Sequence, residues 1–291
     1  MQITPQQHER LTRPIRVNPD AQAAYFTGRH YQGLGTEDCY RKAIGAYEES
    51  IAKDMDFAPA YAGIADVYSA MSSFYMPPRQ AMPKAEAAAR TAISKDPQLA
   101  AAHTSLGYVL AFYKWDRAAG EAELEEAVRL NPNYPTAHLD YGVLLLTYGR
   151  NAEAIQELKK ALDLEPTSAT ASLNLEWAYY LDRQYRKVIE QAHTTLKLKP
   201  RMSGSHSQMA LAMLALGQKQ EALSELKKAV RMEPNSLNAT FYAYALAVLG
   251  RKAEAKSELE KYVKSMGSRY YCAYELATAY ESAGDRPNAL L

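Results

Sequence analysis

The sequence has few cysteines, almost no net charge and no long hydrophobic run. Its two cysteines, Cys39 and Cys272, stand far apart, which excludes a disulfide framework and the ligand spacing of a zinc site. The 34 lysines and arginines balance 33 aspartates and glutamates, which argues against a disordered tail and against nucleic-acid binding. No stretch of eighteen apolar residues occurs, and residues 1–20 lack the apolar centre of a signal peptide. We therefore expect no membrane insertion, a reducing compartment and a cytoplasmic location.

The chain also lacks the short motifs that carry catalysis. It contains no Gly-x4-Gly-Lys-Ser/Thr loop for phosphates, no Gly-x-Gly-x-x-Gly, no His-Glu-x-x-His and no Cys-x-x-Cys. The sequence therefore predicts a protein that is not an enzyme and that has no catalytic residue, no cofactor and no metal site.

A repeat of 34 residues runs through the sequence. Its clearest marker is a run of the type Ala-Leu-x-Leu-x-Pro that recurs every 34 residues. The four prolines that close these runs are Pro132, Pro166, Pro200 and Pro234. Before each proline stand two stretches with helical periodicity, for example 137–149 and 152–162, separated by a glycine-centred turn. Because 47% of the residues are hydrophobic, stacked helix pairs can bury a substantial core.

These units resemble the tetratricopeptide repeat, whose pattern is Trp-x2-Leu-Gly-x2-Tyr, then Ala-x3-Phe, then Pro over 34 residues. Small residues at the Gly and Ala slots let the two helices of a repeat approach closely. The Gly slot is occupied by Gly28, Ala65, Gly107, Gly142, Glu176, Ala210, Ala243 and Ala277. His103, His138 and His206 occupy the Trp slot in three repeats, so we expect packing rather than a shared metal site. The resemblance implies an all-α fold, a right-handed superhelical solenoid of antiparallel helix pairs.

The resemblance covers nearly the whole chain and divides it into a leader and eight repeats. Residues 1–20 form an N-terminal leader or linker, and residues 21–291 form the repeat array. The expected repeats are 21–57, 58–99, 100–132, 133–166, 167–200, 201–234, 235–267 and a truncated 268–291. Because the last repeat ends where its second helix begins, we expect its open face to pair with a second copy or with a following polypeptide.

The first three repeats have longer spacings between the Gly slot and the first Ala slot than the usual 12 residues. This spacing predicts longer turns, the longest being 72–79 with its Pro-Pro pair.

Glu176 is the one charged residue in a Gly slot. A buried and unpaired carboxylate is unfavourable, so we expect its side chain to reach the edge of the helix pair toward Arg183, Arg186 or Lys187. A functional acid is the alternative.

The first helices of six repeats contain no lysine or arginine. They are 59–71, 101–113, 136–148, 170–182, 203–216 and 237–249. The resemblance implies that first helices line the concave wall of the solenoid, which here is expected to be aromatic and apolar. The candidate groove residues are Tyr108, Phe112, Asn174, Trp177, Tyr180, Gln208, Phe241 and Tyr244. The absence of cations in these helices disfavours a carboxylate clamp or a phosphate ligand, and pure packing between helices remains an open alternative.

The sequence therefore favours a non-catalytic interaction scaffold that binds an apolar peptide or protein segment on its concave face. Segments 83–89 and 96–103 are similar to repeat arrays of bacterial signalling proteins, which implies a sensory or docking module of a larger protein. Two alternatives stay open. The array could dock onto a kinase, cyclase or other effector domain outside this chain, or it could recruit substrate for an enzyme such as a transferase.

Overall fold

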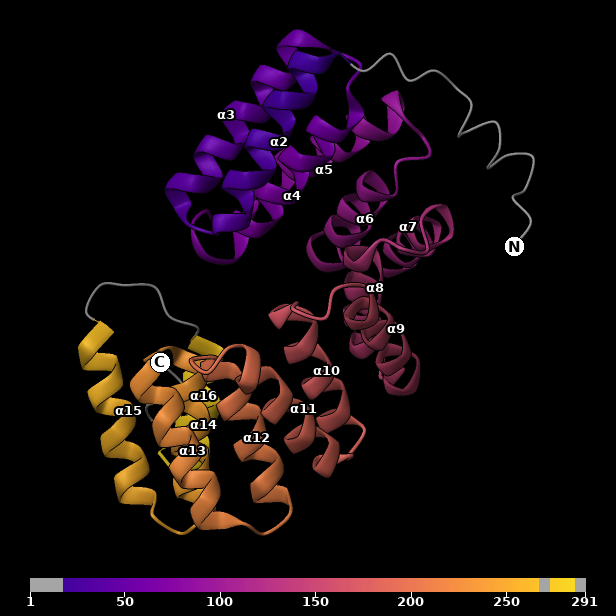
Figure 1. The fold of residues 1–291 in the computed structure, drawn as a ribbon. Helices are drawn as coiled ribbons and strands as arrows, with labels where there is room; N and C mark the ends of the chain where they lie inside the picture. The colour runs from indigo at the N-terminus through magenta and orange to yellow at the C-terminus, as the bar shows by residue number, and fades with distance from the viewer. Residues whose placement is uncertain (1–17, 267–272, 286–291) are drawn as a thin grey trace. The chain divides into compact units, whose positions relative to one another are not determined.

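The computed structural model describes residues 18–266 and 273–285, and every regular element within these ranges is a helix (Figure 1). The first half of the chain contains α2 (Pro19–Leu34), α3 (Glu37–Lys53), α4 (Ala58–Phe74), α5 (Pro78–Lys95), α6 (Ala100–Tyr108), the π-helix η1 (Val109–Tyr113), α7 (Arg117–Leu130) and α8 (Pro135–Thr147). The second half contains α9 (Asn151–Leu164), α10 (Ala169–Leu181), α11 (Tyr185–Leu198), α12 (Ser203–Ala215), α13 (Lys219–Met232), α14 (Ser236–Val248), α15 (Lys252–Met266) and α16 (Ala273–Ser282). The predicted all-α fold of helix pairs is confirmed.

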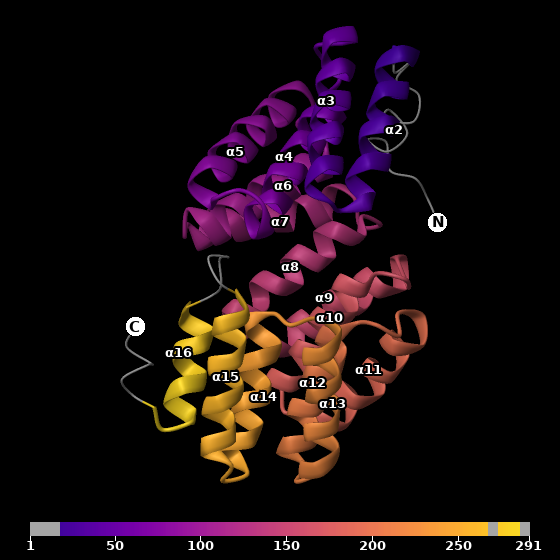
Figure 2. The ribbon, with the colours of Figure 1, turned by 90° about the vertical axis from the view of Figure 1, so that its left-hand side faces the viewer.

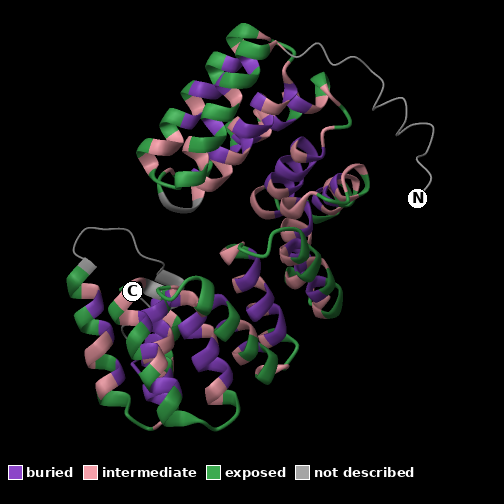
Figure 3. Cartoon of the chain, in the orientation of Figure 1, coloured by how far each residue is buried: buried purple, intermediate pink, exposed green. Residues whose placement is uncertain are grey.

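The described residues form two compact parts, an N-terminal part that ends at Asp140 and a C-terminal part that starts at Tyr141. Most helices pack against the next helix of the chain, for example α2 against α3 and α4 against α5, and Figure 2 shows this for α12 to α15. Helix α16 instead packs mainly against α14. The second helices of the repeats bury one side and expose the other, whereas the first helices α6 and α12 have almost no exposed residue (Figure 3). None of the described helices combines the length and the apolar character that crossing a membrane needs.

The first helix pair is closed by capping groups and by one buried tyrosine. The side chain of Asn18 accepts hydrogen bonds from the first backbone N–H groups of α2 and donates one of 2.9 Å to the carbonyl of Lys53, at the end of α3. Tyr47 is fully buried between α2 and α4. A Cβ atom at Gly28 or Gly63 would lie within 2.6 Å of its ring, so both glycines are required by this close approach.

The extra residues of the first repeats lengthen the helices instead of the turns, so the prediction of longer turns is wrong. Helices α2 to α5 are 16 to 18 residues long, whereas α8 to α14 are 13 or 14. The turn expected over 72–79 contains only 75–77, because α4 continues to Phe74 and α5 already begins at Pro78. The single extra residue of the third repeat is absorbed by the π-helix Val109–Tyr113, whose wider turn takes up one residue.

In the C-terminal part, each turn that follows the first helix of a repeat contains one residue with a left-handed backbone conformation. Four of the five are glycines, Gly149, Gly217, Gly250 and Gly284, with φ between 72° and 80°. Arg183 takes the same position in the fifth repeat with φ 57°. The N–H of the next residue, Gln184, donates a 2.8 Å hydrogen bond to the carbonyl of Tyr179, and Gln218 does the same to Met213 over 2.9 Å. The turn is therefore kept although its glycine is missing.

The core of the C-terminal part is built at the repeat positions that hold Tyr and Phe in the family pattern. In the C-terminal part, Leu226, Leu246, Leu259 and Tyr280 come from four consecutive helices and belong to one buried cluster. In the N-terminal part, Tyr47, Val67 and Met71 form the corresponding cluster. Residues 286–291, on which the truncated last repeat depends, and Cys272 lie outside the described residues.

Candidate binding surface on the first helices

The first helices α2, α4, α6, α8, α10, α12 and α14 share a row of side chains at fixed distances from the Gly slot. The row contains the residues two before, one after and four after that slot, which lie on one side of an α-helix. We call this row the first-helix surface and describe it separately in the two parts. The second and third repeats meet along it, because Asp66 stands one residue after its slot and contacts Ser105, two residues before the next slot.

In the N-terminal part, the first-helix surface is polar and charged. The Ser105 hydroxyl donates a hydrogen bond to Asp66, and Gln32 and Arg29 also act on this carboxyl. The Tyr47 hydroxyl donates a 2.5 Å hydrogen bond to Gln32 Oε1, which fixes the amide. Burial nevertheless raises the pKa of Asp66 to about 6, against the lowering by Ser105, Arg29 and Gln32.

Asp140 is the second acid of this surface. Its side chain is half-buried, and no hydrogen bond or ion pair to it occurs within the described residues. Burial and the negative charge of Asp66 raise the pKa of Asp140 to about 8. The charge of Asp140 in turn contributes to a raised pKa of Tyr108, after the burial of that phenol. The two carboxyls are thus close enough to repel each other.

The prediction of an aromatic and apolar wall is therefore wrong for the N-terminal part. The six helices without lysine or arginine leave out α2, which supplies the exposed Arg29. The charged character of this surface could have been predicted from the sequence. Arg29 and Asp66 directly follow their Gly slots, and Asp140 stands two residues before its Gly slot. Two predicted residues do lie here: Tyr108 and Phe112 are half-buried, with ring centroids 4.9 Å apart.

In the C-terminal part, the first-helix surface brings three of the predicted aromatics together. The rings of Trp177 and Tyr180 are stacked, with centroids 5.3 Å apart and an interplanar angle of 11°. Burial raises the pKa of Tyr180, and the nearby phenols of Tyr185 and Tyr244 raise it further. Tyr244 is 41% exposed. Trp177 and Tyr180 are half-buried, so these rings form a surface that a partner can reach.

The other predicted residues of the C-terminal part differ in the contacts that their side chains make. Asn174 donates a 2.9 Å hydrogen bond to the carbonyl of Thr170 in its own helix. Gln208 is half-buried, and its Oε1 is buried without a hydrogen-bond partner in the described structure. Phe241 packs partly against the buried core.

Glu176 does not reach the edge of the helix pair, so the prediction for this residue is wrong. Its side chain is fully buried, and Oε1 accepts hydrogen bonds of 2.7 Å from Thr195 and 2.9 Å from Ser205. Burial raises the pKa of Glu176 to about 7, against the lowering by these two hydroxyls. The hydroxyls of Thr195 and Ser205 thus satisfy one oxygen of the buried acid.

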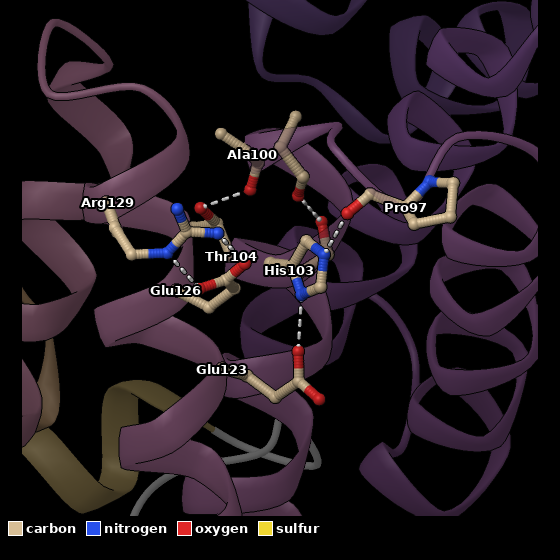
Figure 4. A network of polar contacts seen from close by, with 9 residues as sticks. Pro97, Ala100, His103, Thr104, Glu123, Glu126 and Arg129 are labelled. Atoms are coloured by element: carbon tan, nitrogen blue, oxygen red, sulfur yellow. Dashed lines mark hydrogen bonds and ion pairs between the residues drawn. The ribbon is translucent and has the colours of Figure 1, made fainter. Parts of the chain in front are cut away.

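Two of the three repeated histidines link the two helices of their repeats. His103 contacts Glu123 Oε2 over 2.6 Å and the carbonyl of Pro97 over 3.0 Å (Figure 4). His206 Nδ1 likewise contacts Glu225 Oε2 over 2.6 Å, but its Nε2 is buried without a hydrogen-bond partner within the described residues. Both contacts cross from a first helix to a second helix, so they support packing. Among the described side chains, no three His, Cys, Asp or Glu residues gather into a metal site.

A cavity of about 20 Å³ lies between the start of α10 and the end of α11. Its walls include Ser168, Ser172, Gln191 and Thr195. This space holds about one water molecule and is too small for a substrate.

Comparison with known proteins identifies the repeat. Residues 111–169 match the tetratricopeptide repeat family. The anaphase-promoting complex subunit 3 of Schizosaccharomyces pombe is 23% identical over 150 residues, which is 52% of this chain. The match covers only 22% of that relative, so the chain spans less than a quarter of its length.

Solved structures share the fold over most of the chain. A tetratricopeptide repeat protein from Parabacteroides merdae covers 92% of this chain and 100% of its own, with a TM-score of 0.60 and 13% identity. Human IFIT1, solved as a dimer with m7Gppp-AAAA, covers 97% of this chain and 73% of its own, with a TM-score of 0.71 and 16% identity. Likenesses of such low identity establish the fold and carry no information on the ligand.

Proposed function

Because the chain is a solenoid of tetratricopeptide repeats, a fold that serves as a scaffold for protein–protein interaction, we propose that it binds a polypeptide segment on its first-helix surface. The observation that carries the proposal is the stacked and accessible pair of Trp177 and Tyr180 beside Tyr244. Aromatic side chains offer a large contact area at low entropic cost, and a few of them usually dominate an interface. The partner of the C-terminal part is therefore an apolar or aromatic segment.

The N-terminal part adds a preference for positive charge. Asp66 and Asp140 repel each other, and within the part of the chain that the structure describes Arg29 is the opposite charge that acts on Asp66. A lysine or arginine side chain placed between the two carboxyls would remove this repulsion and gain a charge-assisted hydrogen bond. The proposed partner therefore carries a basic residue for this part of the surface.

Random peptides displayed on phage and selected on the full chain test the proposal. Selection should enrich peptides that contain both aromatic or aliphatic residues and a lysine or arginine. The double variant Asp66→Asn with Asp140→Asn should bind an enriched peptide about 10-fold to 100-fold more weakly, which is the scale of a charged hydrogen bond. Asp163→Asn, an exposed acid on the second helix α9, is the matched control and should leave the affinity unchanged. Enrichment of acidic peptides, or none at all, would contradict the proposal.

The wider role is proposed on the resemblance alone. We propose a sensory or docking module of a bacterial signalling protein that acts in the cytoplasm and has no catalytic activity of its own. Its last repeat would pair with a second copy or with another segment of the same polypeptide. A full reading frame that encodes a kinase, cyclase or winged-helix domain would support this role, whereas a transferase domain would favour substrate recruitment.

A further inference from the structure

Glu176 occupies the most crowded position of its repeat. At the equivalent Gly142, an added Cβ would already lie 2.8 Å from Leu158 of the following helix. The residue that corresponds to Leu158 in the next repeat is Ala192, which is fully buried. In the fourth repeat the first helix has the small residue and the second helix the large one, and in the fifth repeat this order is reversed. The side chain that fills the space between α10 and α11 is therefore a glutamate instead of a leucine.

Both oxygens of Glu176 lie inside this junction, but only one is satisfied. Oε1 accepts from Thr195 of α11 and from Ser205 of α12, so the carboxyl joins three helices that belong to repeats five and six. Oε2 is buried and has no hydrogen-bond partner within the described residues. A buried carboxylate with a bare oxygen is strongly unfavourable, whereas a protonated carboxyl is neutral.

No described charge neutralises Glu176. From α12, His206 is engaged with Glu225, and from α11 Lys187 lies over the Tyr179 ring. The remaining charged groups on the neighbouring helices α9 and α11 are Glu153, Glu157, Lys159, Lys160, Asp163, Arg186, Glu190, His193 and Lys197. None of them contributes to the pKa of Glu176, which burial raises to about 7.

A short chain of hydroxyls leads from Glu176 toward the surface. Thr195 Oγ1 contacts Ser172 Oγ, to which Gln191 donates a 2.8 Å hydrogen bond. Ser172, Gln191 and Thr195 also line the one-water cavity between α10 and α11. Water can therefore come within two hydroxyls of the carboxyl and exchange its proton.

We propose that Glu176 is a proton-controlled latch, which holds α10, α11 and α12 together while it is protonated and loosens this junction when it ionises. The latch lies one residue before Trp177, so on the proposed function it also links acidity to the aromatic surface. Its test needs no partner, and its failure would leave the proposed binding untouched.

Hydrogen exchange of the full chain measures the latch directly. Between pH 5 and pH 8, after correction for the intrinsic exchange rate, amides of α10 to α12 should open on the order of 100-fold more often, the scale of a carboxyl pKa raised from 4.5 to about 7. Glu176→Gln cannot ionise and should abolish this pH dependence. Glu190→Gln removes an exposed carboxylate from α11 and should behave as the unmodified chain.

A second measurement covers the case in which Glu176→Gln fails to fold. Carbon-13 NMR of the unmodified chain should show the Glu176 carboxyl titrating near pH 7. A midpoint below pH 5, or the same pH dependence of exchange in Glu176→Gln as in the unmodified chain, would overturn the latch.

Discussion

The ring of Tyr47 occupies the space into which a side chain at Gly28 would project, since a Cβ there would lie 2.5 Å from Tyr47 Cε1. Tyr47 is fully buried and cannot move aside without disturbing α4. Gly28→Ala should therefore destabilise the N-terminal part by about 1–2 kcal/mol, because overpacking outweighs the gain in helix propensity.

Gly45 provides the matched control for this substitution. It lies exposed in the middle of α3, with nothing within 4 Å of an added Cβ. Gly45→Ala should stabilise by roughly 0.5–1 kcal/mol in a denaturant titration. Equal effects of the two substitutions would show that Tyr47 does not enforce the glycine.

Arg183→Gly should stabilise the C-terminal part by about 1 kcal/mol. Arg183 holds a left-handed backbone where the other turns of the C-terminal part have glycine, and a side chain makes this conformation less favourable by about 1–2 kcal/mol. The thermal midpoint should rise for Arg183→Gly and stay unchanged for Arg183→Lys. A fall in the midpoint with glycine would mean that the arginine side chain itself stabilises the turn.

The ion pair between His103 and Glu123 predicts a pH dependence of stability in the N-terminal part. Its hydrogen bond to Glu123 raises the pKa of His103 above its unfolded value. The contribution of this pair to the free energy of unfolding is fully present below the pKa of His103 in the unfolded chain, about 6.5. It is lost as the pH rises through the pKa of His103 in the folded chain. Free energies of unfolding from pH 5 to pH 9 should therefore fall less for His103→Gln than for the unmodified chain. Parallel curves would contradict this assignment.

Binding of a basic peptide should strengthen with pH. Asp66 and Asp140 have raised pKa values of about 6 and about 8, so both are partly protonated near neutrality in the free chain. A cation favours their charged forms, so affinity should increase from pH 6 to pH 8 and fall with added salt. Calorimetry in buffers of different ionisation enthalpy should detect proton release on binding. Uptake of protons, or affinity that is independent of pH, would exclude the two acids as the site.

The fold could be predicted from the sequence because the 34-residue spacing of the prolines and the small residues at the Gly slots repeat along the chain. Helix ends were harder, since extra residues can extend a helix, as at Phe74 and Pro78, or widen one turn, as at Val109–Tyr113. Either solution satisfies the same spacing, and only the packing of neighbouring helices selects between them.

The geometry of the first-helix surface was predicted only in part. Trp177, Tyr180 and Tyr244 could be placed together because the helical period puts them on one side of α10 and α14. Glu176 could not be placed, because its burial depends on hydroxyls from two other helices, at Thr195 and Ser205. Such contacts between distant residues leave no periodic signal in the sequence.

The most direct test of the binding surface compares affinity and stability in one double variant, Trp177→Ala with Tyr180→Ala. Affinity for a selected peptide should fall by about 2–4 kcal/mol, while the thermal midpoint barely changes. Trp115→Ala removes the other tryptophan, which is 71% exposed on a turn, and should change neither quantity. A free energy of unfolding that falls by several kcal/mol in the double variant, without a specific loss of binding, would show that the two rings belong to the core. This result would contradict the proposed function.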